Sequence, residues 1–395
     1  MRIFNTLTRR VDEFNADGPV GLYVCGVTPY DTTHVGHART YLVFDVLVRQ
    51  LMHLGHRVNY IQNITDVDDS ILERARDLEE SYRSLGDRYT AIYMEDLAAL
   101  GILPASAYPR ATGAIPEIQE VIRRLLATGH AYRVEGDVYL SVSKLEHFGE
   151  LSRLERDEMM RIEADQNGST VGDERKRDPL DLLLWRAAPS GEAAWDSPWG
   201  PGRPGWHIEC STLAFKHLGK ALDIHGGGSD LIFPHHEAEI AQSEATTGHR
   251  PFARFWVHVE MAQLDGHKMA KSAGNMVFVR DLLTRWTPDA LRVYLLSTHY
   301  REPLDFDERK LSDADDVARE LTRAAHARVA DPGAEAPWLE WRGEFDQALE
   351  NDLDTPAAIE VLRGLRRALM KGEITYRGRA ELRALASRLG LSLEG

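Results

Sequence analysis

Short apolar runs alternate along the chain with longer stretches in which apolar residues recur at helical spacing. Residues 20–25 form an apolar run that is typical of a buried parallel strand. The apolar stripe from Tyr41 to Leu51 predicts a helix over 37–54, and a second strand follows at 57–63. This strand–helix–strand order favours an α/β protein built on a parallel sheet.

The middle of the chain departs from this order. The stretch 70–101 has helical spacing, and a Pro- and Tyr-containing break then opens a new unit. A helix over 116–128 and a hairpin around Gly136 and Asp137 belong to this unit. We therefore interpret about 103–200 as an insertion that interrupts the sheet domain.

The sheet pattern resumes after a loop rich in proline and glycine, with strands predicted at 221–225 and 255–259. Pro234 is expected to open a helix, because proline is favoured in the first helical turn. From about residue 280 the spacing is helical, apart from a linker at 330–337. The C-terminal part is therefore predicted to be a helical unit.

Composition narrows the class of protein. Of the 395 residues, 43% are hydrophobic and 28% charged, as in ordinary soluble proteins, and the net charge of −15 argues against non-specific coating of nucleic acid. No apolar run reaches the roughly 18 residues of a membrane span, and the first residues lack the apolar segment of a signal peptide. With only Cys25 and Cys210, thiol chemistry or a metal is favoured over a disulfide. We expect a cytoplasmic protein.

A strand-to-helix turn contains the first candidate chemistry. His34 and His37, in the motif HVGH, lie at the predicted start of a helix, with Gly36 between them. A helix N-terminus favours negative charge, and imidazoles there can donate hydrogen bonds to phosphate oxygens. A four-residue match of this kind is commonly accidental, so its weight depends on the rest of the chain.

Two cysteines, a histidine and a glutamate could form a metal site. His235 and Glu239 are four positions apart on a predicted helix and share a face, while Cys25 follows a strand and Cys210 precedes a helix. Two sulfurs, one imidazole and one carboxylate suit Zn²⁺. The alternative is that the cysteines are small core residues and that the other two cap a helix. The spacing alone leaves both interpretations open.

Two lysines and a glycine run could contact a polyphosphate. Lys268 and Lys271 lie in a glycine-flanked loop that could close over phosphates, and Gly226–Gly228 could cradle a nucleotide. The chain has no GxxxxGKS/T motif, which excludes a P-loop protein. Solvated surface lysines and a flexible turn are the simpler alternatives.

Taken together, these motifs resemble those of a known family. HVGH and KMAKS resemble the HIGH and KMSKS motifs of class I aminoacyl-tRNA synthetases. The stretches that resemble cysteinyl-tRNA synthetases specifically are CGVTPYD, ITDVDD, KRDPLDLLLW, GRPGWHIECS, DIHGGGSDLIFPHHEAEIAQ and GHKMAKSAGN. The resemblance runs from about residue 15 to 310 and weakens in the tail, where LENDLDTPAAIEVL is still similar. The mycothiol-pathway ligase, which joins cysteine to an amino-sugar inositol, is a related family with the same core.

The resemblance implies a fold and a division into domains. We expect an α/β fold, namely a class I synthetase Rossmann-like parallel sheet domain with an α/β insertion, followed by a C-terminal helical bundle. The catalytic domain would cover 1–310, with the KMAKS loop region at about 261–305, and the helical domain would cover 311–395. Near Leu389 the sequence reaches the point where the family's anticodon-binding domain would begin, so we expect that domain to be lacking.

The resemblance also assigns roles to individual residues. The ligands of one Zn²⁺ per chain would be Cys25, Cys210, His235 and Glu239. The catalytic residues around the ATP phosphates would be His34, His37, Lys268 and Lys271. The residues around the cysteinyl group or the adenylate would be Gly26, Thr28, Thr40, Thr65, Trp206, Gly228 and Asp230. Ala270 stands where the family usually has serine, and we expect activation to survive this change.

The activity implied by the resemblance is activation of L-cysteine with ATP and Mg²⁺ to cysteinyl-adenylate, followed by transfer to the 3′ end of tRNA(Cys). The same adenylate chemistry with glucosaminyl-inositol as acceptor is the alternative. A non-catalytic paralogue that binds cysteine or adenylate is a more remote one. We expect the protein to act as a monomer.

Overall fold

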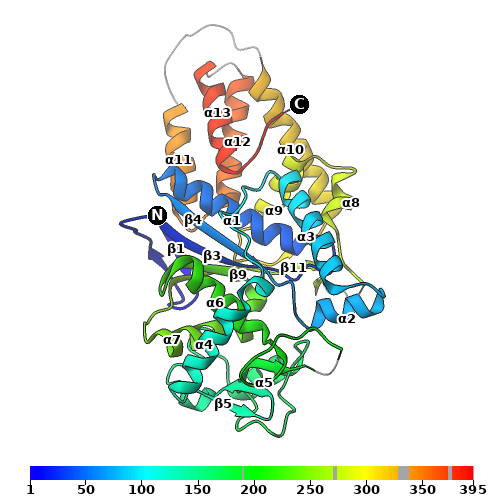
Figure 1. The fold of residues 1–395 in the computed structure, drawn as a ribbon. Helices are drawn as coiled ribbons and strands as arrows, with labels where there is room; N and C mark the ends of the chain where they lie inside the picture. Colours follow the sequence, from blue (N-terminus) through cyan, green and yellow to red (C-terminus); the bar gives the residue numbers. More distant parts are fainter. Residues whose placement is uncertain (189–190, 270–273, 328–337, 372–375, 395) are drawn as a thin grey trace.

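A four-stranded parallel sheet forms the centre of the protein. The computed structural model describes residues 1–188, 191–269, 274–327, 338–371 and 376–394 (Figure 1). Its central sheet, in the order β10-β9-β3-β4, consists of β3 (Val20–Val27), β4 (Val58–Ile64), β9 (Leu222–Gly228) and β10 (Ala253–Val259). All four strands predicted from the sequence are confirmed. Strand order reverses between β3 and β9, and in sheets of this kind ligands bind beside such a reversal, at the carboxyl ends of the strands.

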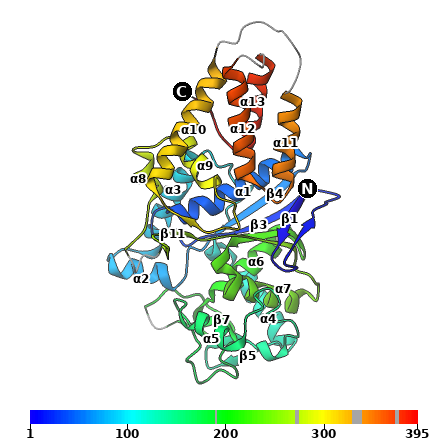
Figure 2. The same cartoon turned by 180° about the vertical axis from the view of Figure 1, so that it is seen from behind.

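Helices cover both faces of the sheet (Figures 1 and 2). The covering helices are α1 (Val35–His53) and α9 (Pro288–Leu296) on one face, and α6 (Trp206–Leu218) and α7 (Glu237–Thr247) on the other. Alternate residues of β3 enter different cores: Leu22 and Val24 join the core on the α1 side, whereas Tyr23 and Cys25 join the core on the α6 side. The strand therefore directs Cys25 towards α6.

The segment predicted to be an insertion folds into helices and a second sheet on the α6 side, and it shares a core with α6 and α7. It contains η1 (Ala111–Ala114), α4 (Ile115–Ala127), η2 (Val142–Lys144) and α5 (Arg156–Ala164). Its antiparallel sheet consists of β5 (Ala131–Val134), β6 (Asp137–Leu140), β7 (Leu182–Ala187) and β8 (Gly202–Pro204). The hairpin expected around Gly136 and Asp137 is the turn between β5 and β6.

One segment differs from the sequence prediction, and one prediction about a proline is confirmed. The stretch 70–101 is not one helix but α2 (Asp69–Asp77) and α3 (Tyr82–Ala99), separated by a turn in which Glu79 has a φ of 53°. Pro234 opens a helix, as the sequence predicts. It follows the extended Phe233 inside the segment η4 (Ile232–His236), and the backbone stays helical from Pro234 into α7. Because proline disfavours helical backbone in the residue before it, Phe233 is extended (φ −136°, ψ 134°).

Smaller elements complete the two ends of the chain and the loops at the strand ends. These elements are β1 (Arg2–Asn5), β2 (Arg10–Glu13), η3 (Ser229–Leu231), β11 (Ala262–Leu264), β12 (His267–Lys268), α8 (Val279–Leu283) and β13 (Leu304–Asp305). The C-terminal helices are α10 (Glu308–His326), α11 (Trp338–Glu350), α12 (Thr355–Met370) and α13 (Tyr376–Arg388). The predicted linker at 330–337 lies outside the described residues.

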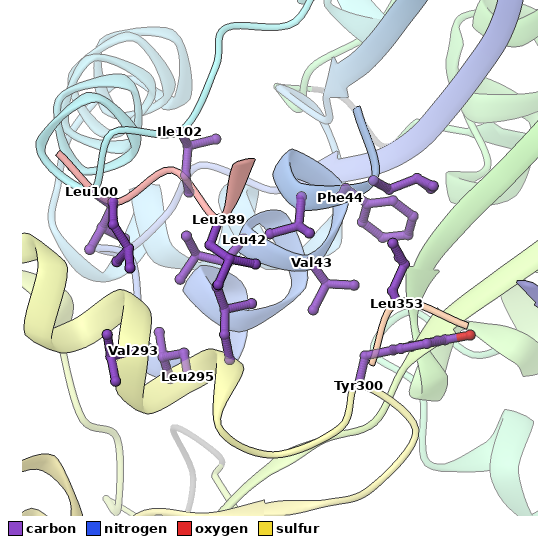
Figure 3. Close-up of a cluster of buried hydrophobic side chains, with 14 of the residues drawn as sticks. Leu42, Val43, Phe44, Leu100, Ile102, Val293, Leu295, Tyr300, Leu353 and Leu389 are labelled. Atoms are coloured by element: carbon purple, nitrogen blue, oxygen red, sulfur yellow. The ribbon is translucent and has the colours of Figure 1, made fainter. Parts of the chain in front are cut away.

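The larger of the two cores joins the C-terminal helices to the sheet domain. Figure 3 shows Leu42 of α1 near Leu389, which follows α13, with Val293 and Leu295 of α9 on the same side, and Phe44 of α1 near Leu353. The same core includes apolar residues of α10, α12 and α13. The helix that begins at the HVGH motif, α1, therefore packs against the C-terminal helices through this shared core. The domain boundary near residue 310 stays a prediction.

Candidate functional site

An irregular pairing at the end of β3 positions Cys25. The regular register between β3 and β4 holds up to Val24 and is interrupted before Val27. In this interval Gly26 N–H donates to Asn63 Oδ1 at 2.8 Å. A Cβ at position 26 would lie 1.6 Å from Asn63 O, so only glycine fits here. The close approach of the two strands places the Cys25 sulfur on the α6 side, at the carboxyl end of the sheet.

Three further elements bring the other predicted ligands to this sulfur. Cys210 lies on α6 and is buried, and His235 and Glu239 lie on η4 and α7. Glu239 Oε1 lies 3.3 Å from Cys25 Sγ and 3.2 Å from His235 Nε2. The donor atoms of Cys25, Cys210, His235 and Glu239 all lie within 4.8 Å of one another. The structure thus brings together the complete predicted ligand set, whose two sulfurs, nitrogen and oxygen suit zinc.

A second group of possible ligands shares part of this site. His225 and His236, together with Cys25 and Glu239, also place their donor atoms within 4.8 Å of one another. His225 Nε2 lies 2.9 Å from Glu239 Oε2, and His236 Nε2 lies 3.3 Å from Cys25 Sγ. Sequence spacing did not single out either histidine, although His236 is next to His235 and His225 ends the predicted strand at 221–225. Only contacts between separate elements, His225 with Glu239 and His236 with Cys25, show that they face the site.

Burial controls the protonation of these groups. It raises the pKa of the Cys25 thiol, and a hydrogen bond with Cys210 raises that pKa further. Burial also raises the pKa of Glu239 and lowers the pKa of His225 to about 3. The protein alone therefore favours neutral side chains. A divalent cation reverses this preference for the thiols and the carboxyl group, because they bind metals in their deprotonated forms.

A cavity of about 450 Å³ opens above the cluster. The predicted ligands that line it are Cys25, Cys210 and His235, and Glu239 is buried beneath them. The other predicted site residues that line it are Gly26, Thr28, His34, His37, Thr40, Thr65, Trp206, Gly228, Asp230 and Lys268. Lys271 and Ala270 lie outside the described residues. The structure therefore gathers the metal, phosphate and substrate candidates around one cavity.

The HVGH motif forms the N-terminus of α1 at one wall of this cavity. His34 is the N-cap, and its Nδ1 accepts hydrogen bonds from the backbone N–H groups of Gly36 at 3.1 Å and His37 at 3.4 Å. Burial and the neighbouring His37 ring lower the pKa of His34 to about 2, and burial lowers that of His37 to about 4. Since Nδ1 of His34 accepts, its single proton is on Nε2. The ring can therefore donate one hydrogen bond while remaining neutral.

A partly exposed ion pair crosses the cavity mouth. Lys268 Nζ, at the end of β12, lies 3.2 Å from Asp230 Oδ2 in η3. The side chains are 56% and 42% exposed, so this pair contributes little to stability and can separate. Both residues line the cavity, where the carboxylate could meet a cation and the ammonium group an anion.

The acidic turn after β4 supplies the hydrogen-bond partner of Thr28, and Asn63 in β4 supplies that of Thr65. The sequence had indicated the two threonines but not their partners. Thr28 Oγ1 donates to Asp68 Oδ2 at 2.8 Å, and Asp68 Oδ1 caps α2 by accepting from Ile71 N–H at 2.8 Å. Burial raises the pKa of Asp68 to about 6. Asn63 Nδ2 donates to Thr65 Oγ1 at 3.1 Å. These bonds fix the Thr28 and Thr65 hydroxyls at the cavity wall.

The insertion also reaches the cavity. Gln166 and Asn167, in the loop after α5, line it, and Asn167 donates to Ser70 Oγ and Glu73 Oε2 of α2, each at 3.1 Å. No sequence signal identified these two residues, because their position depends on how the insertion folds back over α2.

Comparison with known proteins gives results in agreement with this geometry. A family model described as tRNA synthetases class I (C) catalytic domain matches residues 12–316. The chain is 44% identical to the cysteine–tRNA ligase of Aquifex aeolicus over 402 residues, which cover 95% of this chain and 80% of that protein. It is 43% identical to the cysteine–tRNA ligase of Dehalococcoides mccartyi over 402 residues, with coverage of 100% and 86%.

A solved structure shares the fold. The methionyl-tRNA synthetase of Mycobacterium tuberculosis in complex with methionyl-adenylate matches with a TM-score of 0.66, over 94% of this chain and 89% of that chain. At 16% identity this likeness shows the fold alone. Within the described residues, no helix combines the length and the apolar character needed to cross a membrane.

Proposed function

The chain belongs to the class I tRNA synthetase family defined by the (C) catalytic domain, and on this premise we propose that it joins L-cysteine to tRNA(Cys) with ATP. One observation supports this function above the others. A buried Cys–Cys–His–Glu cluster and the HVGH helix start line the same cavity. The cluster suits the thiol of a small substrate, and the helix start suits a phosphate.

We propose that Cys25, Cys210, His235 and Glu239 hold one Zn²⁺. Their mixed sulfur, nitrogen and oxygen donors fit this metal, and three of the four open towards the cavity. When bound, the metal would hold the sulfur of cysteine as a thiolate. Serine offers only a hard hydroxyl, so a pocket with this metal can reject serine more strongly than one that relies on shape.

The chain's own residues would bind the other end of the amino acid. In this proposal Asp230 exchanges its partner Lys268 for the ammonium group of cysteine. The exchange releases the Lys268 ammonium group towards the ATP phosphates. Thr28, whose hydroxyl is oriented by Asp68, lies at the same wall of the cavity. Substrate binding and phosphate binding are then coupled through one ion pair.

Activation would proceed by in-line substitution at the α-phosphate of ATP with Mg²⁺ as counter-ion. A carboxylate oxygen of cysteine forms the new bond to phosphorus, the bond to the bridging oxygen breaks, and pyrophosphate leaves. The α1 N-terminus, His34 Nε2–H and His37 would stabilise the phosphate charge as neutral donors, with the ammonium groups of Lys268 and Lys271.

Transfer would then regenerate the free site. A hydroxyl of the 3′-terminal ribose of tRNA attacks the carbonyl carbon of cysteinyl-adenylate, the new ester forms, and AMP leaves. The relatives from Aquifex aeolicus and Dehalococcoides mccartyi are named for this acceptor. An amino-sugar inositol would undergo the same acyl transfer through its amine, so acceptor identity belongs in the test.

The test measures ATP–pyrophosphate exchange and acyl transfer separately. We expect exchange with L-cysteine, and exchange with L-serine lower by more than about 200-fold, the limit for a pocket without a specific contact. Lys271→Ala should lose most exchange. Lys220→Ala, an exposed lysine away from the cavity, is the matched control and should retain it.

In the second assay the purified chain receives tRNA(Cys) transcript or glucosaminyl-inositol as acceptor. We expect cysteine to be transferred to the transcript. Equal exchange with serine would refute the cysteine assignment, and transfer to the amino sugar alone would replace the tRNA ligase with the mycothiol-type ligase.

A further inference from the structure

A hydrogen-bonded series of side chains connects the N-terminal segment to the candidate metal site. Thr6 Oγ1 lies 2.7 Å from His258 Nδ1, His258 Nε2 lies 2.7 Å from His236 Nδ1, and His236 Nε2 lies 3.3 Å from Cys25 Sγ. All four side chains belong to buried residues, at most 7% exposed. Bulk water therefore does not compete for these bonds, and each donor must be matched by an acceptor.

The series has one consistent direction once the Cys25 sulfur is a thiolate. A neutral imidazole has one N–H donor and one acceptor nitrogen. Because a thiolate only accepts, His236 must donate through Nε2 and accept at Nδ1. His258 must then donate through Nε2 and accept at Nδ1. The proton for this last bond comes from the hydroxyl group of Thr6.

This direction distinguishes the two possible ligand sets. With a proton on Nε2, His236 cannot bind a metal beside Cys25, so the set with Cys210 and His235 remains. If the series reversed, the lone pair of His236 Nε2 would face the site. The competing set of Cys25, His225, His236 and Glu239 would then be available, and it contains one sulfur in place of two.

We propose that Thr6 is a positioning residue for the zinc site: its hydroxyl donates to His258 Nδ1 and completes the series that the thiolate directs. It thereby stabilises the tautomers in which His236 donates to the Cys25 sulfur and stays out of the coordination shell. This inference rests on the zinc site of the proposed function. Residues that orient metal ligands from outside the coordination shell commonly change metal affinity about 10- to 100-fold when they are replaced.

The experiment compares Thr6→Val with Thr6→Ser in the zinc-loaded full chain. Valine keeps the volume and removes the hydroxyl, whereas serine keeps the hydroxyl. X-ray absorption at the zinc edge counts bound sulfurs at roughly 2.3 Å. We expect two protein sulfurs in the wild type and in Thr6→Ser, and fewer in Thr6→Val. Zinc affinity, measured by competition with a chelator, should fall about 10-fold in Thr6→Val alone.

Thr8→Val is the matched control. The Thr8 hydroxyl is in the same N-terminal segment but donates to Asp12 Oδ2 at 2.5 Å, away from the series. Loss of that hydroxyl should leave sulfur count and zinc affinity unchanged. The KM for cysteine in pyrophosphate exchange should rise in Thr6→Val more than kcat falls, because the hydroxyl acts on the site that holds the substrate sulfur.

The outcomes separate the inference from its premise. A wild-type chain that binds no zinc contradicts the proposed function itself. A wild-type chain with two zinc-bound sulfurs, together with a Thr6→Val variant of equal sulfur count and affinity, overturns the role of Thr6. If Thr6→Val does not fold, nitrogen NMR of zinc-loaded wild type with labelled histidines tests the proposal, because it shows which ring nitrogen carries the proton. His236 and His258 must both carry their proton on Nε2, and a proton on Nδ1 of either ring refutes the proposal.

Discussion

Single residues at the site occupy positions that tolerate little change, and Gly26 is the clearest case. Its backbone N–H donates to Asn63 Oδ1 at 2.8 Å. The position that a Cβ atom would take is occupied by Asn63 O. The neighbouring position presents the Cys25 sulfur. Glycine is required at position 26 because β3 and β4 approach each other closely there, next to Cys25, whose sulfur faces α6.

We predict that Gly26→Ala destabilises the chain by about 1–3 kcal/mol and lowers its zinc content, because β3 and β4 must separate to admit the methyl group. Urea unfolding and metal analysis of the purified variant check both effects. Gly18→Ala is the control, since a Cβ there meets no atom within 4 Å. Equal losses in both variants would show that the close approach at position 26 is unimportant.

Asp68 gives a prediction on pH dependence. Its pKa is raised by burial to about 6, above the roughly 3.9 of an unfolded aspartate. The folded state therefore binds this proton more tightly, and the resulting stability is present below about pH 4 and is lost as the pH rises through 6. Asp68→Asn keeps an oxygen for the Ile71 cap and has no proton to lose.

Relative to wild type, we expect Asp68→Asn to gain of the order of 1–3 kcal/mol of unfolding free energy between pH 4 and pH 7. Urea unfolding at several pH values measures this difference. A constant difference between the two proteins across that range contradicts the raised pKa.

At the scale of elements, sequence reasoning found what depends on local pattern and missed what depends on packing. The apolar runs predicted all four central strands, and the HVGH turn predicted the start of α1 to within two residues. Pro234 was correctly expected in the first helical turn, since Phe233 before it is extended and the backbone from Pro234 onward is helical. His225 and Asn167 had no local signal, since only the contact of separate elements brings them to the cavity.

One buried side chain ties α1 to two loops near the cavity. Arg39 Nη1 donates to Glu260 O at 3.1 Å, and Nη2 donates to His299 O at 2.9 Å and Glu302 O at 2.5 Å. Glu260 lines the cavity. The planar guanidinium reaches three carbonyls in fixed directions, which a lysine ammonium cannot reproduce.

We therefore predict that Arg39→Lys lowers stability by about 1–3 kcal/mol and raises the KM for ATP, because buried carbonyls lose donors and the loop at Glu260 shifts. Thermal unfolding and pyrophosphate exchange measure the two effects. Arg57→Lys, at an exposed position, should change neither. Unchanged kinetics in Arg39→Lys would mean that the loop holds its position without this clamp.

At the scale of the whole molecule, a buried charge cluster joins parts of the chain that lie far apart in sequence. Arg292 of α9 forms an ion pair with Asp45 of α1 and donates to Leu100 O at 2.8 Å and, through Nε, to Leu389 O at 2.8 Å. Its side chain is 1% exposed. Figure 3 shows Leu100 and Leu389 in the apolar cluster between α1 and α9. The C-terminal segment is thereby bound to the helix that begins at the HVGH motif.

Arg49 also pairs with Asp45, at 2.9 Å, but its side chain is 19% exposed, so the two arginines test the effect of burial on the same carboxylate. We predict that Arg292→Gln costs about 3–5 kcal/mol, because it leaves buried carbonyls and part of a buried charge without a donor. Arg49→Gln should cost only about 1 kcal/mol, since water can replace the lost donor. Urea unfolding followed at several probes should show one transition in both variants, because α1 and the C-terminal helices share a core. If Arg292→Gln instead released the C-terminal helices in a separate transition while pyrophosphate exchange persisted, the helices would be an independent unit and α1 would not need them.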